Sequence, residues 1–230
     1  MVNRVQPYSI KTDGFSGKDI EVIAQIHRKE IGTGFLASLG LEPAKLLYSA
    51  LADSRNCLIV AGLKKYTGLV GFIAGTVDFQ AFCGDFLRTK GLAALRMVLP
   101  QMFSRVGLKN AIEAVTFAVW RRRSGLPRAQ ILNFAVQPDY RGSGLAATLF
   151  LEIMRQFWRR GVREVVILSG AEQEQAHRFY QKMGAYQIGS TTVHRGRKDL
   201  VFLFQNNDWT TERMRAEGGL PGNLRDLQFE

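Results

Sequence analysis

The sequence predicts an α/β domain in which strands alternate with helices and a basic helical segment is inserted near the middle. Three observations carry this prediction. Short apolar runs of strand length alternate with longer segments whose apolar residues recur at helical spacing. A glycine-rich turn joins one such strand to one such helix. Residues 79–128, which precede that strand, predict further helices and hold most of the net positive charge.

The length of 230 residues fits one domain with an insertion, and its hydrophobic content of 46% is sufficient for a core of that size. We expect a single domain over residues 1–205, with the insertion at about 79–128. Residues 206–230 are expected to form a polar C-terminal tail.

The elements before the insertion are marked by helix-start signals and by a hairpin. Ser16, with Asp19 three residues later, predicts a capping box, and Pro43 is placed to open a second helix. The expected elements are a strand over Tyr8–Lys11, a helix after Ser16, a short helix over Ala44–Ala52, and a hairpin of strands Cys57–Leu63 and Leu69–Val77.

The insertion predicts two or three helices, over residues 82–89, 92–106 and 108–123, divided at Gly91 and Gly107 and kinked or started by Pro100. Nine basic and two acidic residues give it +7 of the chain's +11 net charge. One interpretation is extra packing over the sheet or a homodimer interface. The other is a basic lid or platform, with Arg121–Arg123 in it, for an anionic acceptor or a lipid surface. No nucleic-acid motif accompanies the arginines, which disfavours a nucleic-acid partner.

The glycine-rich turn lies between the strand Ala129–Val136 and a helix that begins near Leu145. Gly142 and Gly144 permit a sharp turn that exposes backbone N–H groups at the positive end of the helix dipole, where an anion is stabilised. The turn also fits the dinucleotide pattern GxGxxA formally. Pro138, Asp139, Tyr140 and Arg141 intervene before the first glycine, and too little chain follows for a doubly wound sheet, so we reject that interpretation.

The remaining elements follow the turn in a regular alternation. The expected elements are the helix ended by Gly161, a strand over Val165–Ser169, a helix over Glu172–Met183 ended by Gly184, and a hairpin of strands Tyr186–Val193 and Leu200–Gln205.

Two motifs in this half resemble the GCN5-related N-acetyltransferases (GNAT). Arg141-x-x-Gly144-x-Ala146 is similar to the acetyl-CoA signature of that family, and Phe179-Tyr180 before Gly184 is similar to its later helix. The resemblance covers about residues 129–205. It implies the GNAT acyl-CoA N-acyltransferase fold, a mixed central sheet flanked by helices, here with a helical insertion before the cofactor-binding strand.

The resemblance also implies a cofactor, acetyl-CoA, and the residues that hold it. The central strand would splay from its neighbour, and its backbone would pair with the pantetheine arm while the turn holds the pyrophosphate. Gln173 stands where the family has an asparagine, and Tyr180 matches the general acid that protonates the departing thiolate. The implied cofactor-binding residues are Phe134, Ala135, Val136, Arg141, Gly142, Ser143, Gly144, Leu145, Ala146, Ala147 and Gln173.

The general base is not given by the resemblance. Some relatives place a glutamate near the start of the central strand, where this chain has about Gln130, and an amide cannot accept a proton. The candidates are His27, Glu30 and His194, or a water chain. His177, in the later helix, is expected at the surface.

The expected function is acetyl transfer from acetyl-CoA to a primary amine. The basic balance suits an anionic small molecule such as a nucleotide-linked amino sugar. The alternatives are a protein or peptide amine as acceptor, and a non-catalytic module that binds acyl-CoA or nucleic acid.

The sequence also indicates a cellular compartment. We expect no signal peptide, because Met1–Lys11 has no continuous apolar core, and no apolar run approaches the ~20 residues of a membrane span. The two cysteines, Cys57 and Cys83, give neither a disulfide framework nor a metal pattern, so we expect no metal. A reducing cytoplasm is the expected location.

Overall fold

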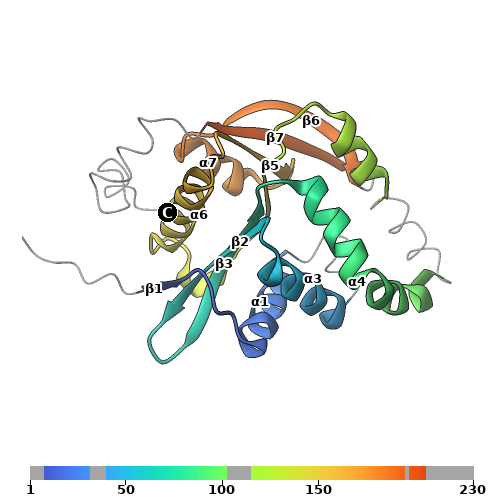
Figure 1. The fold of residues 1–230 in the computed structure, drawn as a ribbon. Coiled ribbons are helices and arrows are strands. Elements are labelled where there is room, and N and C mark those ends of the chain that lie inside the picture. The colour runs from blue at the N-terminus through green and yellow to red at the C-terminus, as the bar shows by residue number, and fades with distance from the viewer. Residues whose placement is uncertain (1–7, 32–39, 103–114, 195–196, 206–230) are drawn as a thin grey trace, which may run out of the picture.

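The structure, a computed structural model, describes residues 8–31, 40–102, 115–194 and 197–205 (Figure 1). Its strands form one sheet in the order β1-β2-β3-β4-β5-β7-β6. The strands are β1 (Tyr8–Lys11), β2 (Cys57–Lys64), β3 (Gly68–Thr76), β4 (Gln130–Val136), β5 (Glu164–Gly170), β6 (Tyr186–His194) and β7 (Arg197–Gln205). The helices are α1 (Gly17–Glu30), α3 (Leu41–Asp53), α4 (Phe79–Met102), α6 (Leu145–Arg159) and α7 (Glu174–Lys182), with a short 3-10 turn, η1 (Pro138–Tyr140).

The sheet is mixed, as the sequence predicts. Only β4 and β5 among its neighbouring strands pair in parallel; the other pairs are antiparallel. Helices α1 and α3 cover one face, and α6 and α7 cover the other (Figure 1). Because side chains alternate across a strand, Leu58 and Val60 of β2 pack toward α6, whereas Cys57 and Ile59 pack toward α1 and α3.

The predicted start of α1 is confirmed. Ser16 Oγ accepts from the backbone N–H of Asp19 at 3.2 Å, and the Asp19 carboxylate accepts from the backbone N–H of Ser16 at 2.8 Å. This reciprocal box satisfies two donors that would otherwise be open at the helix end. The helix then runs to Glu30, which places His27 and Glu30 in its last turn.

The insertion differs from its prediction. A break at Gly91 was wrong, and so was a helix start at Pro100, because α4 runs without interruption from Phe79 to Met102. Asp78 Oδ1 accepts from two backbone N–H groups of the first turn, at 2.9 and 3.0 Å. An interior glycine destabilises a helix by only about 1 kcal/mol, and Phe82 and Phe86 pack the first half of α4 into the core. Residues 115–123 are helical, while Gly107 and residues 108–114 lie outside the described residues.

One arginine of the insertion is structural. Arg121 is buried, and its Nε donates to Gln130 Oε1 at 2.8 Å. The two terminal nitrogens of its guanidinium donate to the backbone carbonyls of Leu126 and Pro127. These bonds tie the end of the insertion to the start of β4. Arg121 is therefore not part of an exposed platform, which corrects that part of the second interpretation of the insertion.

The sheet opens between its two parallel strands. Pairing of β4 with β5 consists of Gln130 with Val166 and Ile131 with Ile167, and within these two fully described strands it goes no further. A bulge lies at the same point, because β3 pairs through Ala74 with Asn133 and through Gly75 with Ile131, which leaves Leu132 as the extra residue. Beyond the bulge, the backbone of β4 toward Val136 has one edge that β5 does not cover.

Candidate active site

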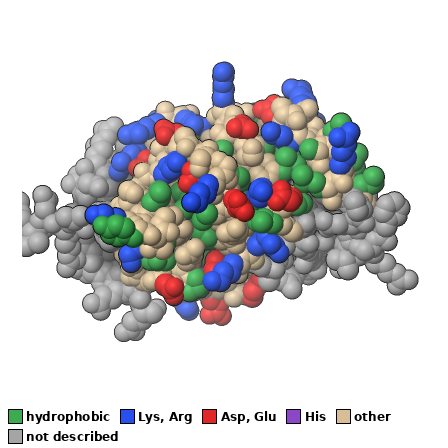
Figure 2. Space-filling model, turned by 90° about the horizontal axis from the view of Figure 1, so that it is seen from below, with side chains coloured by type: hydrophobic (Ala, Val, Ile, Leu, Met, Phe, Trp, Pro, Cys, Tyr) green, Lys and Arg blue, Asp and Glu red, His purple; other side chains and the backbone are tan. Residues whose placement is uncertain are grey.

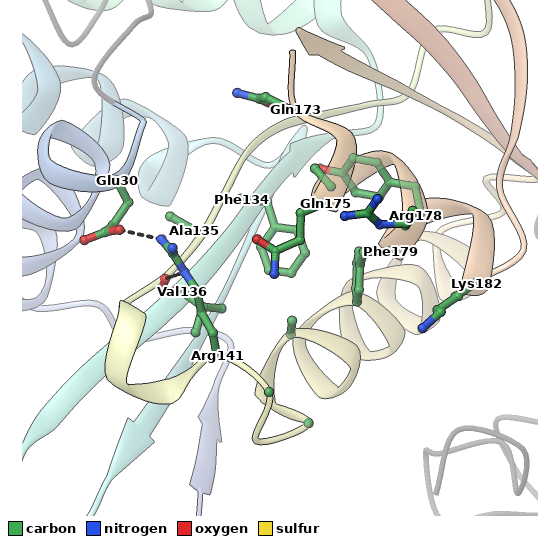
Figure 3. A pocket seen from close by; sticks show the side chains of 15 residues that line it. Glu30, Phe134, Ala135, Val136, Arg141, Gln173, Gln175, Arg178, Phe179 and Lys182 are labelled. Atoms are coloured by element: carbon green, nitrogen blue, oxygen red, sulfur yellow. Dashed lines mark hydrogen bonds and ion pairs between the residues drawn. The ribbon is translucent and has the colours of Figure 1, made fainter. Parts of the chain in front are cut away.

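A cavity of about 520 Å³ lies where β4 ends, between the start of α6 and the face of α7 (Figure 3). Nine of the twelve predicted site residues line this cavity. These are Phe134, Ala135, Val136, Arg141, Gly142, Gly144, Ala146, Gln173 and Tyr180. Ser143, Leu145 and Ala147 do not line it.

The glycine turn has the predicted backbone. Gly142 and Gly144 have φ of 72° and 85°, a region that side chains disfavour. Gly144 is the N-cap of α6 and has no side chain to cap this 15-residue helix, although the Leu145 N–H donates to Ser143 Oγ at 3.5 Å. A Cβ built on Gly144 meets no atom within 4 Å. The turn is therefore an open cradle suited to an anion.

The three predicted residues outside the lining have other surroundings. The side chains of Leu145 and Ala147 are buried in the core between α6 and the sheet. Ser143 is exposed, and its Oγ donates to the Tyr140 carbonyl at 2.7 Å. For Leu145 and Ala147, a role in holding a ligand would therefore rest on the backbone N–H groups, of which that of Leu145 also donates to Ser143 Oγ at 3.5 Å.

Arg141 and Glu30 join α1 to the turn although 111 positions separate them. Glu30 Oε2 lies 2.6 Å from an Arg141 terminal nitrogen, and Arg141 Nε donates to the Val136 carbonyl at 3.1 Å. The Glu30 side chain is 8% exposed, and its Oε1 is buried with no hydrogen-bond partner. Figure 3 shows Glu30 on the opposite side of the cavity from Arg178 and Lys182 of α7.

Helix α7 forms the second wall. Gln173, its N-cap, accepts a hydrogen bond at Oε1 from Ser169 Oγ at 2.9 Å, which leaves the amide nitrogen as a donor for a ligand. His177, expected at the surface, is buried, because its Nε2 donates to the Gly170 carbonyl at 2.9 Å and its ring packs on Phe202.

Tyr180 lines the cavity from within an aromatic cluster. Its ring centroid lies 6.3 Å from that of Phe150 and 6.0 Å from that of Phe202. Burial raises the pKa of the Tyr180 phenol above its usual value. The hydroxyl therefore keeps its proton throughout the neutral range, which is the state that a proton donor requires.

The sequence analysis missed a row of cavity residues on α7. Gln175, Arg178 and Lys182 recur at spacings of three and four, so they share one face of the helix, and all three line the cavity. Arg178 and Lys182 add positive charge to the wall opposite Glu30. The helical spacing next to Tyr180 was the signal that could have found them.

His27 is placed in the core and does not line the cavity. Its Nδ1 lies 2.8 Å from the Tyr48 hydroxyl, and its Nε2 is buried without a partner. Burial lowers the pKa of His27 to about 4. Its position does not favour it as a base for a ligand in the cavity.

Acid is expected to destabilise the protein through His27. Because its folded-state pKa is lowered, the unfolded chain binds more protons between pH 6.5 and 4, and stability falls as pH falls through that window. The loss should reach about 3 kcal/mol by pH 4. Urea unfolding at several pH values should show this extra loss in the wild type relative to His27→Gln. Equal pH slopes for the two proteins would contradict it.

The other candidate bases differ in position. His194 ends β6, and its backbone pairs with that of Arg197 at the start of β7. Gln130 is buried at the closed end of the splay, where it accepts from Arg121. Of Glu30 and His27, Glu30 is the one that lines the cavity.

A model of the acetyltransferase (GNAT) family matches residues 33–185, about two thirds of the chain. The chain belongs to this family. The match includes β4, the glycine turn and α7, while Glu30 of α1, which also lines the cavity, lies just before it. Comparison with curated proteins gives no match.

Solved structures of family members share the fold at low sequence identity. A spermidine N-acetyltransferase chimera of Vibrio cholerae SpeG and hSSAT is 12% identical with a TM-score of 0.56, over 89% of this chain and 99% of that chain. The PaiA N-acetyltransferase of Thermoplasma acidophilum, in complex with coenzyme A, is 14% identical with a TM-score of 0.53, over 86% and 99%. The ribosomal-protein-S18-alanine N-acetyltransferase of Escherichia coli is 13% identical with a TM-score of 0.51, over 86% and 95%.

Proposed function

We propose that the protein transfers an acetyl group from acetyl-CoA directly to a primary amine. One observation carries the proposal. The opening between β4 and β5, the glycine turn and Tyr180 all border one cavity in a member of the GNAT family. A non-catalytic binding module would need the turn and the opening but would not need a protonated phenol in the same cavity.

The cavity fits coenzyme A. The open N–H groups at the start of α6 suit the pyrophosphate, with Arg141 beside them and Arg178 and Lys182 on the facing wall. The uncovered edge of β4 at Phe134 to Val136 suits the amide groups of pantetheine, and the Gln173 amide nitrogen is a further donor. When bound, acetyl-CoA would supply the acetyl group as a thioester.

The protein's own groups would then move two protons. A backbone N–H of β4 near Phe134 would polarise the carbonyl oxygen that gains charge. As the amine nitrogen bonds to the acetyl carbon and the carbon–sulfur bond breaks, the Tyr180 hydroxyl would donate its proton to the departing sulfur. The amine must lose a proton in turn.

Glu30 is the acceptor that we propose for that proton. Glu30 lines the cavity from α1, across from the wall formed by α7, and its Oε1, on the side of the carboxylate away from Arg141, is buried without a hydrogen-bond partner (Figure 3). Arg141 holds the other carboxylate oxygen and fixes the orientation of the group. An oriented carboxylate without a competing partner is suited to general-base catalysis.

Glu30→Gln is expected to lower kcat by about 10²-fold, the usual contribution of a general base. Its dissociation constant for acetyl-CoA, measured by calorimetry, should change by less than about threefold, since glutamine keeps one oxygen for Arg141. An unchanged kcat with weakened affinity for acetyl-CoA would contradict the role of Glu30 as the base. Glu30 would then only position Arg141, and water would accept the proton of the amine.

For the acceptor, we propose an anionic small molecule, of which a nucleotide-linked amino sugar is one example. The net charge of +11 supports an anionic acceptor over a polyamine. The direct test is incubation with acetyl-CoA and a panel of nucleotide amino sugars, simple amino sugars, polyamines and peptides, with mass spectrometry for a gain of one acetyl group. Acetylation of the peptides alone would replace the small-molecule acceptor. Release of CoA without any acetylated amine would contradict the proposal.

A further inference from the structure

The insertion exposes more large apolar side chains to solvent than the rest of the described chain does. Nine large hydrophobic side chains are exposed in the described residues, and six of them belong to the insertion. They are Leu87, Leu92, Leu95, Leu99, Val115 and Val119. Figure 2 shows hydrophobic side chains beside lysine and arginine at the right of the view, the side on which α4 lies. Clustered exposure of this kind marks a contact surface.

Helix α4 is apolar on two sides. Phe82 and Phe86 pack inward, against the core under α1 and α3. Leu92, Leu95 and Leu99 follow at spacings of three and four, so they form a stripe along one face of the helix, and they are 64%, 51% and 48% exposed. The inner side accounts for the position of α4 on the domain. The outer stripe has no such partner among the described residues.

The charges around the stripe are of one sign. Arg88 lies one turn before Leu92, and Arg96 lies one turn after it, and both are exposed. Asp85 is the one acidic residue in the described parts of the insertion, and its carboxylate accepts from Asn56 Nδ2 at 3.3 Å. A partner for this surface must therefore offer apolar groups to the leucines and neutral or negative groups to the arginines.

We propose that the outer face of α4, defined by Arg88, Leu92, Leu95, Arg96 and Leu99, docks the enzyme on an anionic lipid surface. Leucines of an interfacial helix enter the boundary between headgroups and acyl chains, and arginines at its sides pair with lipid phosphates. A second copy fits less well, since two such faces would bring arginines together with no carboxylate to pair them. No helix in the described part of the chain is long and apolar enough to cross a bilayer, so the contact is peripheral.

This docking is independent of the acetyl-transfer chemistry. The stripe is formed by α4, and none of its residues lines the cavity between β4 and α7. Lipid binding can therefore be measured without any turnover, and failure of either proposal leaves the other standing.

Sedimentation with lipid vesicles tests the docking. The full-length protein is mixed with vesicles of phosphatidylcholine alone or with about one third phosphatidylglycerol, at low and at physiological salt. We expect binding to the anionic vesicles only, weakened by salt. Leu92→Glu/Leu95→Glu and Arg88→Glu/Arg96→Glu should each reduce it at least about tenfold.

Matched variants control for charge and for exposure. Lys18→Glu/Lys65→Glu changes the net charge as much as Arg88→Glu/Arg96→Glu does, but at exposed sites away from α4. Ile188→Glu is the control for the leucine variant, because it replaces an exposed apolar residue on β6. Both should bind vesicles as the wild type does. Leu92→Ser/Leu95→Ser repeats the apolar loss without adding charge, and thermal melts verify that each variant is folded.

Three results would overturn the proposal. The first is no binding of the wild type to anionic vesicles. The second is equal loss of binding in the charge control, which would make the attraction a property of net charge and not of this face. The third is a wild-type dimer in sedimentation velocity that the leucine variants convert to monomer, which would assign the face to a second copy of the chain.

Discussion

Gly144→Glu is expected to abolish measurable binding of acetyl-CoA. Gly144 has φ of 85°, and a Cβ there points into open space at the cavity mouth. A glutamate would fill the cradle at the start of α6 and bring negative charge to the place that suits a phosphate. Calorimetric titration should show the dissociation constant raised at least about 100-fold, which corresponds to about 2.7 kcal/mol.

Gly161→Glu is the matched control for that variant. Gly161 follows the other end of α6, has φ of 75°, and likewise has no atom within 4 Å of a built Cβ. It carries similar backbone strain and the same added charge, far from the cavity. Its affinity for acetyl-CoA should equal that of the wild type. Wild-type affinity in Gly144→Glu, or equal loss in both variants, would remove the turn from the cofactor site.

Tyr180→Phe should lower kcat by about 10² to 10⁴-fold and leave the affinity for acetyl-CoA nearly unchanged. Phenylalanine keeps the ring contacts with Phe150 and Phe202 and removes only the hydroxyl that would protonate the sulfur. Steady-state rates of acetylated amine, with calorimetry for the cofactor, separate the two effects.

Tyr48→Phe is the control for Tyr180→Phe. Tyr48 is also a buried tyrosine, but its hydroxyl meets His27 in the core on the other side of the sheet from α7. Removal of the Tyr48 hydroxyl should lower the free energy of unfolding and leave kcat near the wild-type value. Full activity in Tyr180→Phe would contradict the role of Tyr180 as the acid.

The sequence predicted the parts of the site that depend on neighbouring residues. The capping box of Ser16 and Asp19 and the sharp turn at Gly142 and Gly144 depend on a few adjacent residues. The structure confirms both, the turn through the positive φ of the two glycines. The assignment of Tyr180 to a cavity followed from a family motif, and its place in the lining agrees with that assignment.

Features that depend on distant packing were not predictable in this way. The pairing of Glu30 with Arg141 and the bond from Arg121 to Gln130 join segments whose proximity only the folded sheet creates. His177 is buried because α7 turns it toward Gly170, which its sequence neighbours do not reveal. Helix α4 continues through Gly91 and Pro100, although both residues favour a break and its core contacts, Phe82 and Phe86, lie before them.

Hydrogen–deuterium exchange with and without acetyl-CoA tests most directly whether the splay and the turn form the cofactor site. If the splay and the turn form this site, the backbone amides at residues 134–136 and 142–147 will exchange more slowly when acetyl-CoA is added. Exchange at residues 115–123 in the insertion will not change. Unchanged exchange at both predicted segments, at a concentration that saturates binding by calorimetry, would place the cofactor elsewhere and contradict the account.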